Sequence, residues 1–145
     1  MRIHSTMLIV LGLFSSALFA AEPRISNRAA NPDEWGYRPA DGTTVRLNPP
    51  SMTWLHEKDA VIYSVQWAKK PDFSDATTVT NIMWPVYTHY AALPAGTYFW
   101  RYRFATKNGQ MSDWSIARRF TVQVGTTEFP MPAVSQRQER VPKKH

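Results

Sequence analysis

The sequence of 145 residues contains no cysteine. A disulfide framework and a thiolate zinc site are therefore excluded, and the folded domain must draw its stability from an apolar core. Six Trp, six Tyr and seven Phe supply large apolar side chains for such a core. The length suits one domain and little more.

Motifs that accompany catalysis or metal binding are also missing. The chain has no paired-carboxylate signature, no nucleophile elbow and no phosphate-binding loop. Its histidines show no metal-ligand spacing, and its turn aspartates are expected to cap backbone amides. The histidines are His4, His56, His89 and His145, and the aspartates are Asp59, Asp72 and Asp75. We therefore expect no catalytic residue, cofactor or metal ion in this chain.

His89 is the one histidine whose neighbours suggest chemistry. It lies near Tyr87 and Tyr90 in a predicted strand, a grouping that is compatible with an acid–base site. A strand histidine near aromatic residues is more often structural or at the surface. We favour that structural interpretation.

The sequence has no apolar run long enough to span a membrane. The apolar stretch at the N-terminus is too short for that. It follows Arg2 and ends in small residues at Ala20 and Ala21, which is the pattern of a secretory signal peptide over residues 1–20. An N-terminal anchor helix is the alternative. We expect export to the periplasm or the extracellular space.

The charge is modestly basic, with 17 Lys and Arg against 11 Asp and Glu. Removal of Arg2 with the signal leaves 16 minus 11, or +5. Such an excess favours anionic partners: acidic polysaccharide, nucleic acid or lipid headgroups. The charge does not choose among them, but export argues against nucleic acid and we expect no membrane contact after signal cleavage, which leaves acidic polysaccharide open as a partner.

No window shows a helical repeat of apolar residues; short β-branched and aromatic runs recur instead. They predict an all-β, fibronectin type III or immunoglobulin-like antiparallel sandwich of about seven strands over residues 43–124. A polar lead-in over 21–42, anchored by Trp35 and Tyr37, precedes it, and a linker over 125–145 follows. The predicted strands are 44–48, 51–55, 60–69, 76–84, 86–93, 96–106 and 117–124.

Alternation assigns faces on two of these strands. An aromatic set is predicted to point into the core, and Asn108-Gly109 to close a hairpin turn. Tyr98 begins its strand, where sandwiches place a corner tyrosine that binds the preceding loop. The predicted inward residues are Tyr63, Val65, Trp67, Tyr98, Trp100, Tyr102 and Phe104.

The outward face of strand 96–106 carries arginines, and guanidinium groups bind carboxylates and sulfates in bidentate fashion. We favour a solvated, edge-protecting role for them, with glycan binding as the alternative. Trp84 is a further candidate for stacking on a sugar, as a loop residue before Pro85. The candidate glycan-binding residues are Arg101, Arg103, Arg118, Arg119 and Trp84.

Two stretches resemble a fibronectin type III module. They are "NPPSMTWLHEKDAVIYSVQWAKKPDFSDA" and "LPAGTYFWRYRFATKNGQMSDWSIARRFTV". In such modules a Pro-Pro entry leads to an aromatic strand, and a "WS" element, here Trp114-Ser115, precedes a final "FTV" strand. The resemblance implies structural roles for Tyr98, Trp100 and Trp114.

A narrower resemblance covers residues 33–145. "DEWGYRPADGTTVRLNPPSMTW" and the exit "FPMPAVSQRQERVPKKH" are similar to the N-terminal domain of heparinase II/III-like polysaccharide lyases. In that family the sandwich precedes a helical toroid that cleaves uronate-containing chains by β-elimination. A Tyr or His base of the toroid removes the C5 proton, and no residue here corresponds to it. The resemblance implies a non-catalytic N-terminal fragment, expected to stop before the toroid.

Three functions remain open at this stage. The chain is an accessory domain that packs on the toroid, with Trp35 and Tyr37 as docking residues, or a self-standing module that binds acidic glycans or a protein. A generic adhesion or scaffolding domain is the third possibility.

Overall fold

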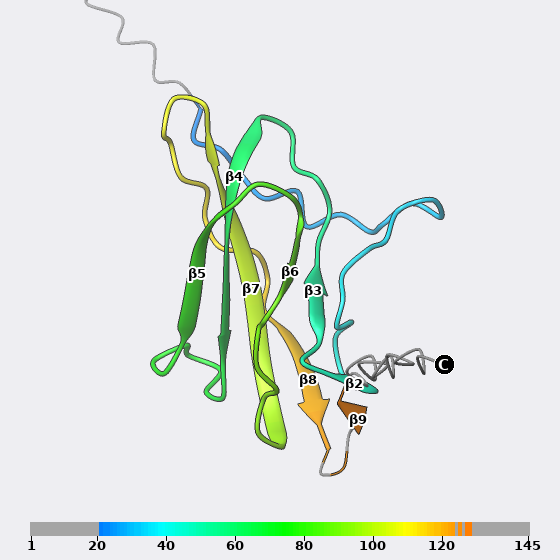
Figure 1. The fold of residues 1–145 in the computed structure, drawn as a ribbon. Helices are drawn as coiled ribbons and strands as arrows, with labels where there is room; N and C mark the ends of the chain where they lie inside the picture. The colour runs from blue at the N-terminus through cyan, green and yellow to red at the C-terminus, as the bar shows by residue number, and fades with distance from the viewer. Residues whose placement is uncertain (1–20, 124, 126, 129–145) are drawn as a thin grey trace, which may run out of the picture.

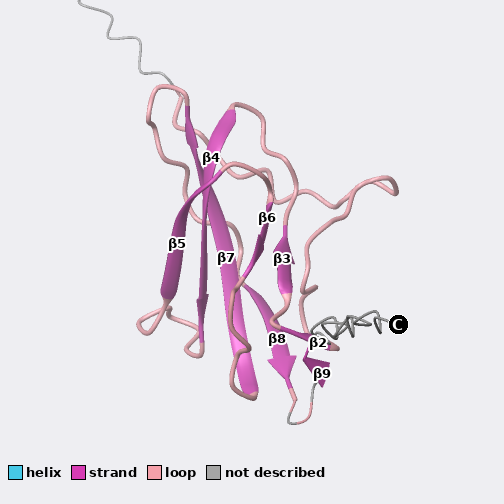
Figure 2. Cartoon of the chain, in the orientation of Figure 1, coloured by secondary structure: helices cyan, strands magenta, loops and turns pink. Residues whose placement is uncertain are grey.

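The computed structural model describes residues 21–123, 125 and 127–128. Over these residues the chain forms nine strands and no helix (Figures 1 and 2). This confirms the predicted all-β class. The strands are β1 (Thr43–Thr44), β2 (Leu47–Asn48), β3 (Ser51–Thr53), β4 (Ala60–Ala68), β5 (Thr77–Ile82), β6 (Val86–Thr88), β7 (Gly96–Thr106), β8 (Arg118–Val122) and β9 (Thr127–Glu128).

The strands form a sandwich. The larger sheet has the order β1-β8-β7-β4-β5, and the smaller sheet pairs β3 with β6. Within them the pairs β3–β6, β4–β5, β4–β7 and β7–β8 are antiparallel, whereas β1 runs parallel to β8. β2 and β9 make a separate parallel pair. This is the fibronectin type III-like arrangement that the sequence predicts.

The core lies between the two sheets and is filled by alternate residues of β4, β7 and β8. Every residue predicted to point inward is at most 4% exposed. Met52 and Trp54 reach the same cluster from β3 and the residue after it. The period of two therefore predicts the inward faces of β4 and β7 correctly. A shift of one residue would instead place the whole aromatic set in water.

The predicted turn at Asn108-Gly109 is confirmed. The amide of Gly109 donates to the carbonyl of Thr106 at 2.9 Å, and Gly109 has a φ of 78°, a region that glycine occupies without strain. β8 does not start directly after this turn. Residues 112–117 intervene, and the Ser112 and Ser115 hydroxyls accept hydrogen bonds from the amides of Phe104 and Tyr102. Serine side chains thus replace regular strand pairing along the upper part of β7.

The outer strands are shorter than predicted. The segment 44–48 is divided, because Val45 donates to Thr121 beside β8 before the chain crosses to pair with β9. β5 ends at Ile82 instead of Trp84, three residues before Pro85, which has no amide hydrogen for a ladder. β6 ends at Thr88. Both central strands, by contrast, match within one residue.

The corner tyrosine is confirmed as well. The Tyr98 hydroxyl donates to the carbonyl of Pro94 at 2.7 Å, which ties β7 to the loop before it. The lead-in, blue to cyan in Figure 1, passes the upper end of the sheets and swings outward as a loop. Tyr37 packs against the core, and the indole of Trp100 donates to the carbonyl of Pro39 at 3.0 Å.

The prediction that Trp35 anchors the lead-in is wrong, since its side chain is 72% exposed. The proposed signal peptide lies outside the described residues, as does most of the 125–145 linker. Among the residues described, no helix is long and apolar enough for a membrane span.

Candidate functional site

An apolar cleft carries two exposed tryptophans. Trp35 of the lead-in and Trp84 of the β5–β6 loop are each 72% exposed and line the same cavity of about 470 Å³. Its remaining wall comes from residues 53–56, at the end of β3 and just beyond it, with Asp33, Glu34, Pro85 and Val86. We call this cavity the tryptophan cleft. Two exposed tryptophans on one cavity form a contiguous apolar surface, and such surfaces often mark interaction sites or ligand-binding grooves.

Both tryptophan-bearing segments are fixed to the same stretch of backbone. Arg38 and Thr53 exchange backbone hydrogen bonds of 3.0 and 2.8 Å, and the Thr53 hydroxyl donates to the carbonyl of Gly36. On the other side, the amide of Trp54 donates to the carbonyl of Pro85 at 3.1 Å. The two segments, nearly fifty residues apart in sequence, therefore meet because each binds the end of β3.

An ion pair holds the outer part of the lead-in loop. Arg28 forms a bidentate pair with Glu34, and Glu34 also accepts a hydrogen bond of 2.7 Å from the amide of Asn31. These hydrogen bonds lower the pKa of Glu34 to about 2. The Tyr37 hydroxyl donates to the carbonyl of Arg28. The loop that presents Trp35 is thus held by hydrogen bonds between its own residues.

A buried carboxylate follows the cleft residue His56 in the sequence. Glu57 is 3% exposed and accepts hydrogen bonds from the Tyr102 hydroxyl at 2.7 Å and from the amide and hydroxyl of Ser26, both at 3.2 Å. We call these three residues the Glu57 cluster. Burial, followed by the hydrogen bond to Glu57 and its negative charge, raises the pKa of Tyr102 far above the ordinary tyrosine value. The cluster fastens the start of the lead-in to the core.

Three of the four candidate arginines share the outer face of the larger sheet. Arg101 and Arg103 alternate on β7, and Arg119 of β8 pairs with Phe99 beside them. The guanidinium carbon of Arg101 lies 3.9 Å from the ring centre of Phe73, and that of Arg103 lies 4.5 Å from that of Trp114. Burial and the nearby charge of Arg103 lower the pKa of Arg101. Stacking therefore already engages the planar faces of Arg101 and Arg103.

Arg118 does not belong to that face. It pairs with Trp100 on the inward side and is 5% exposed. Its guanidinium carbon lies 3.6 Å from the ring centre of Tyr37, and it donates to the carbonyl of Ile116 at 3.1 Å. The expectation that it stands beside Arg101 and Arg103 is corrected: the period of two that places Arg119 outside places Arg118 inside.

The remaining candidate residues have packing contacts. Trp114 covers the guanidinium groups of Arg101 and Arg103. His89 accepts or donates a hydrogen bond of 3.0 Å with the Tyr87 hydroxyl and lies 5.0 Å from the ring centre of Trp67. Among residues 21–123, 125 and 127–128, no three His, Asp or Glu side chains gather in a group that would hold a metal ion.

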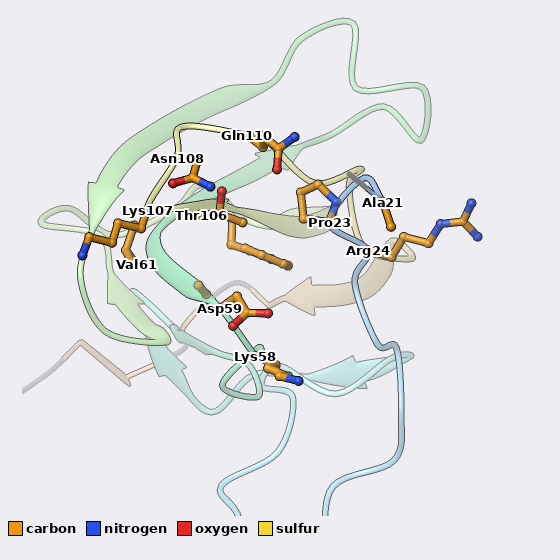
Figure 3. Close-up of a pocket in the computed structure, with 12 residues that line it drawn as sticks. Ala21, Pro23, Arg24, Lys58, Asp59, Val61, Thr106, Lys107, Asn108 and Gln110 are labelled. Carbon is orange, nitrogen blue, oxygen red and sulfur yellow. The ribbon is translucent and has the colours of Figure 1, made fainter. Parts of the chain in front are cut away.

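A second, larger cavity is shown in Figure 3. It has a volume of about 770 Å³ and lies between the start of the lead-in, the beginning of β4 and the end of β7. Arg24, Lys58 and Lys107 contribute positive charge to its lining, and Asp59 contributes one carboxylate. We call it the basic pocket. No local sequence pattern predicts this pocket, because its walls come from three segments.

Comparison with known proteins yields distant structural likenesses only. No protein-family model matches the chain, and no curated protein matches it. An Fn3-like protein from Clostridium thermocellum is 23% identical, with a TM-score of 0.44 over 51% of this chain and 76% of that one. An alpha-L-rhamnosidase from Dictyoglumus thermophilum is 19% identical, with a TM-score of 0.46 over 57% of this chain and 11% of that one. At this identity the likeness concerns the fold alone.

Proposed function

We propose that this chain is a non-catalytic accessory module that docks through its tryptophan cleft on a catalytic partner module. The observation that carries the proposal is the joint exposure of Trp35 and Trp84 on one apolar cavity. Tryptophan is enriched among the residues that dominate binding energies at protein interfaces. Covering two large indole faces removes apolar area from water, which favours association.

The preorganised backbone supports docking further. Hydrogen bonds to Thr53 and Trp54 hold both tryptophan-bearing segments before any partner arrives. Less conformational entropy is then lost on association than for two unrestrained loops. An arrangement built only for folding would bury these side chains, as it buries Trp54 and Trp100.

The partner in this proposal is the catalytic toroid of a heparinase II/III-type lyase that acts on acidic, uronate-containing glycans. The lead-in and exit motifs resemble that family, and Trp35 lies within the lead-in motif. In this role the sandwich packs beside the toroid and helps to frame the substrate cleft. Export, which the N-terminal pattern predicts, agrees with a polysaccharide substrate.

Glycan binding on the outer arginine face is the weaker alternative. Trp114, Phe73 and the side chain of Gln66 already engage Arg101, whose Nε donates to Gln66 at 3.0 Å. A sugar carboxylate at this face would compete with those contacts. Arg119 is the exposed cation that remains there.

The first test is to sequence about two kilobases of DNA beyond the His145 codon, enough to encode more than one further domain of ordinary size. If a toroid is encoded there, the toroid is expressed separately and titrated with this chain by calorimetry. We expect binding that the double variant Trp35→Ala/Trp84→Ala reduces by at least about tenfold. Tyr90→Ala, which removes a side chain 91% exposed outside the cleft, is the matched control.

The stability of the double variant separates docking from folding. Because both side chains are exposed, its thermal midpoint is expected to stay within a few degrees of the parent. The docking proposal is wrong if an encoded toroid does not bind, or if it binds the double variant as tightly as the parent chain. Absence of any related coding region would remove the lyase partner.

A further inference from the structure

We infer that the basic pocket is a binding site for an acidic sugar unit of a glycan chain. The ligand class rests on the proposed function, whereas the site lies apart from the tryptophan cleft and shares no lining residue with it. The inference combines three features: the size of the cavity, the placement of its cations and a buried hydroxyl without a partner.

The size and lining suit a hydroxylated ring. A volume of about 770 Å³ falls within the range of ordinary small-ligand sites, roughly 300–1,000 Å³. Phe104, Pro23 and Val61 supply apolar surface, while Asn108 and Gln110 supply amide groups. A pyranose ring presents the matching chemistry, because its C–H faces are apolar and its hydroxyls both donate and accept hydrogen bonds.

The cations surround the mouth of the pocket. Figure 3 shows Arg24 and Lys107 on opposite sides and Lys58 at a third position, with their charged ends directed away from one another. Such spacing does not converge on one compact anion. It fits an extended ligand that carries several carboxylates or sulfates along its length, each meeting one cation.

Thr106 provides the clearest sign of an absent contact. Its backbone is satisfied, since its amide donates to Gln110 and its carbonyl accepts from Gly109, both at 2.9 Å. Its Oγ1 atom is buried and has no hydrogen-bond partner among the described residues. An unpaired buried hydroxyl costs about 1–3 kcal/mol. A sugar hydroxyl seated in the pocket would supply the missing partner after a small opening of the turn.

The experiment titrates the purified chain with tetrasaccharides of glucuronate, galacturonate or mannuronate, and follows binding by amide chemical shifts and calorimetry. A neutral hexose tetrasaccharide and sodium sulfate are the comparison ligands. We expect at least one oligouronate to bind and to shift the amides of residues 106–110. Sulfate and the neutral sugar should bind at least tenfold more weakly.

Two variants assign the binding to the pocket. Lys58→Gln/Lys107→Gln should weaken oligouronate binding by about tenfold, on the order of what two exposed ion pairs supply. Thr106→Val should weaken it by about fivefold while leaving the thermal midpoint unchanged or raised, because it removes the unpaired hydroxyl. Arg46→Gln/Lys70→Gln, which removes two exposed cations outside the pocket, is the charge-matched control and should bind as the parent does.

The inference is overturned if no oligouronate binds, if sulfate or the neutral sugar binds equally well, or if Lys58→Gln/Lys107→Gln binds like the parent. A lower thermal midpoint in Thr106→Val would show that the hydroxyl has a structural partner, and would remove that part of the reasoning. Toroid docking is measured separately, so its success or failure is distinguishable from either outcome here.

Discussion

Removing the Tyr102 hydroxyl should destabilise the domain and loosen the start of the lead-in. Tyr102→Phe keeps the buried ring and deletes the donor that lies 2.7 Å from the Glu57 carboxylate. Hydrogen bonds to a charged group are worth about 1.5–3 kcal/mol. Glu57 would retain only its contacts with Ser26, both at 3.2 Å. We therefore expect the free energy of unfolding to fall by ~2 kcal/mol.

That loss is large enough to measure in two ways. For a domain of this size, ~2 kcal/mol corresponds to a fall of about 8–16 °C in the thermal midpoint. Urea unfolding, followed by tryptophan fluorescence, gives the free energy directly. Trypsin should also cleave faster after Arg24 and Arg28, since Ser26 lies between them and depends on the same carboxylate.

A double-mutant cycle with Glu57→Gln assigns the loss to the Glu57 cluster. Each single change should destabilise the protein, and the double variant should lose about 1 kcal/mol less than the sum, because the second change breaks a contact already weakened. Tyr90→Phe is the control, with a side chain 91% exposed and no expected effect. The reasoning fails if Tyr102→Phe unfolds within 0.5 kcal/mol of the parent (about the effect of an ordinary surface change), or if the two changes are additive.

Two further predictions concern stability. Trp114→Ala should lower the free energy of unfolding by about 1–2 kcal/mol, because it removes the cation–π contacts of Arg101 and Arg103; an unchanged urea midpoint would contradict it, and Trp84→Ala is the exposed control. Stability should also decline as the pH rises above about 10, since burial raises the pKa of Tyr63, Tyr98 and Tyr102. The unfolded chain then releases tyrosine protons that the folded chain retains, and stability falls with pH. Urea midpoints between pH 8 and 11 that do not decline would refute this.

The central strands were predictable from sequence because each carries its own evidence. Period two over β4 and β7 is long enough to fix both their extent and their inward faces, and the tyrosine corner follows from the position of Tyr98. The end of β5 was not predictable in the same way. Met83 and Trp84 extend the apolar run of β5, yet they lie in a loop and are 73% and 72% exposed, respectively.

The binding surfaces were only partly predictable. The sequence identified Trp84 as an exposed candidate but paired it with arginines, and it assigned Trp35 to anchoring. Their meeting depends on backbone hydrogen bonds to Thr53 and Trp54, which no local pattern reveals. Glu57 gave no signal either, because a single acidic residue after a short strand resembles any loop carboxylate until Tyr102 closes over it.

The hydrogen bonds of the lead-in also have a kinetic consequence. The amide of Arg119 donates to Asp41 across 78 residues, and the amide of Ile116 donates to Asn27 across 89. Chain segments so far apart in sequence meet only after a costly loop closure, so domains rich in such contacts fold slowly. During synthesis these two contacts of the lead-in cannot form until residues 116–119 have left the ribosome. The lead-in therefore reaches its final position late, and until then the nascent chain lacks these two long-range contacts.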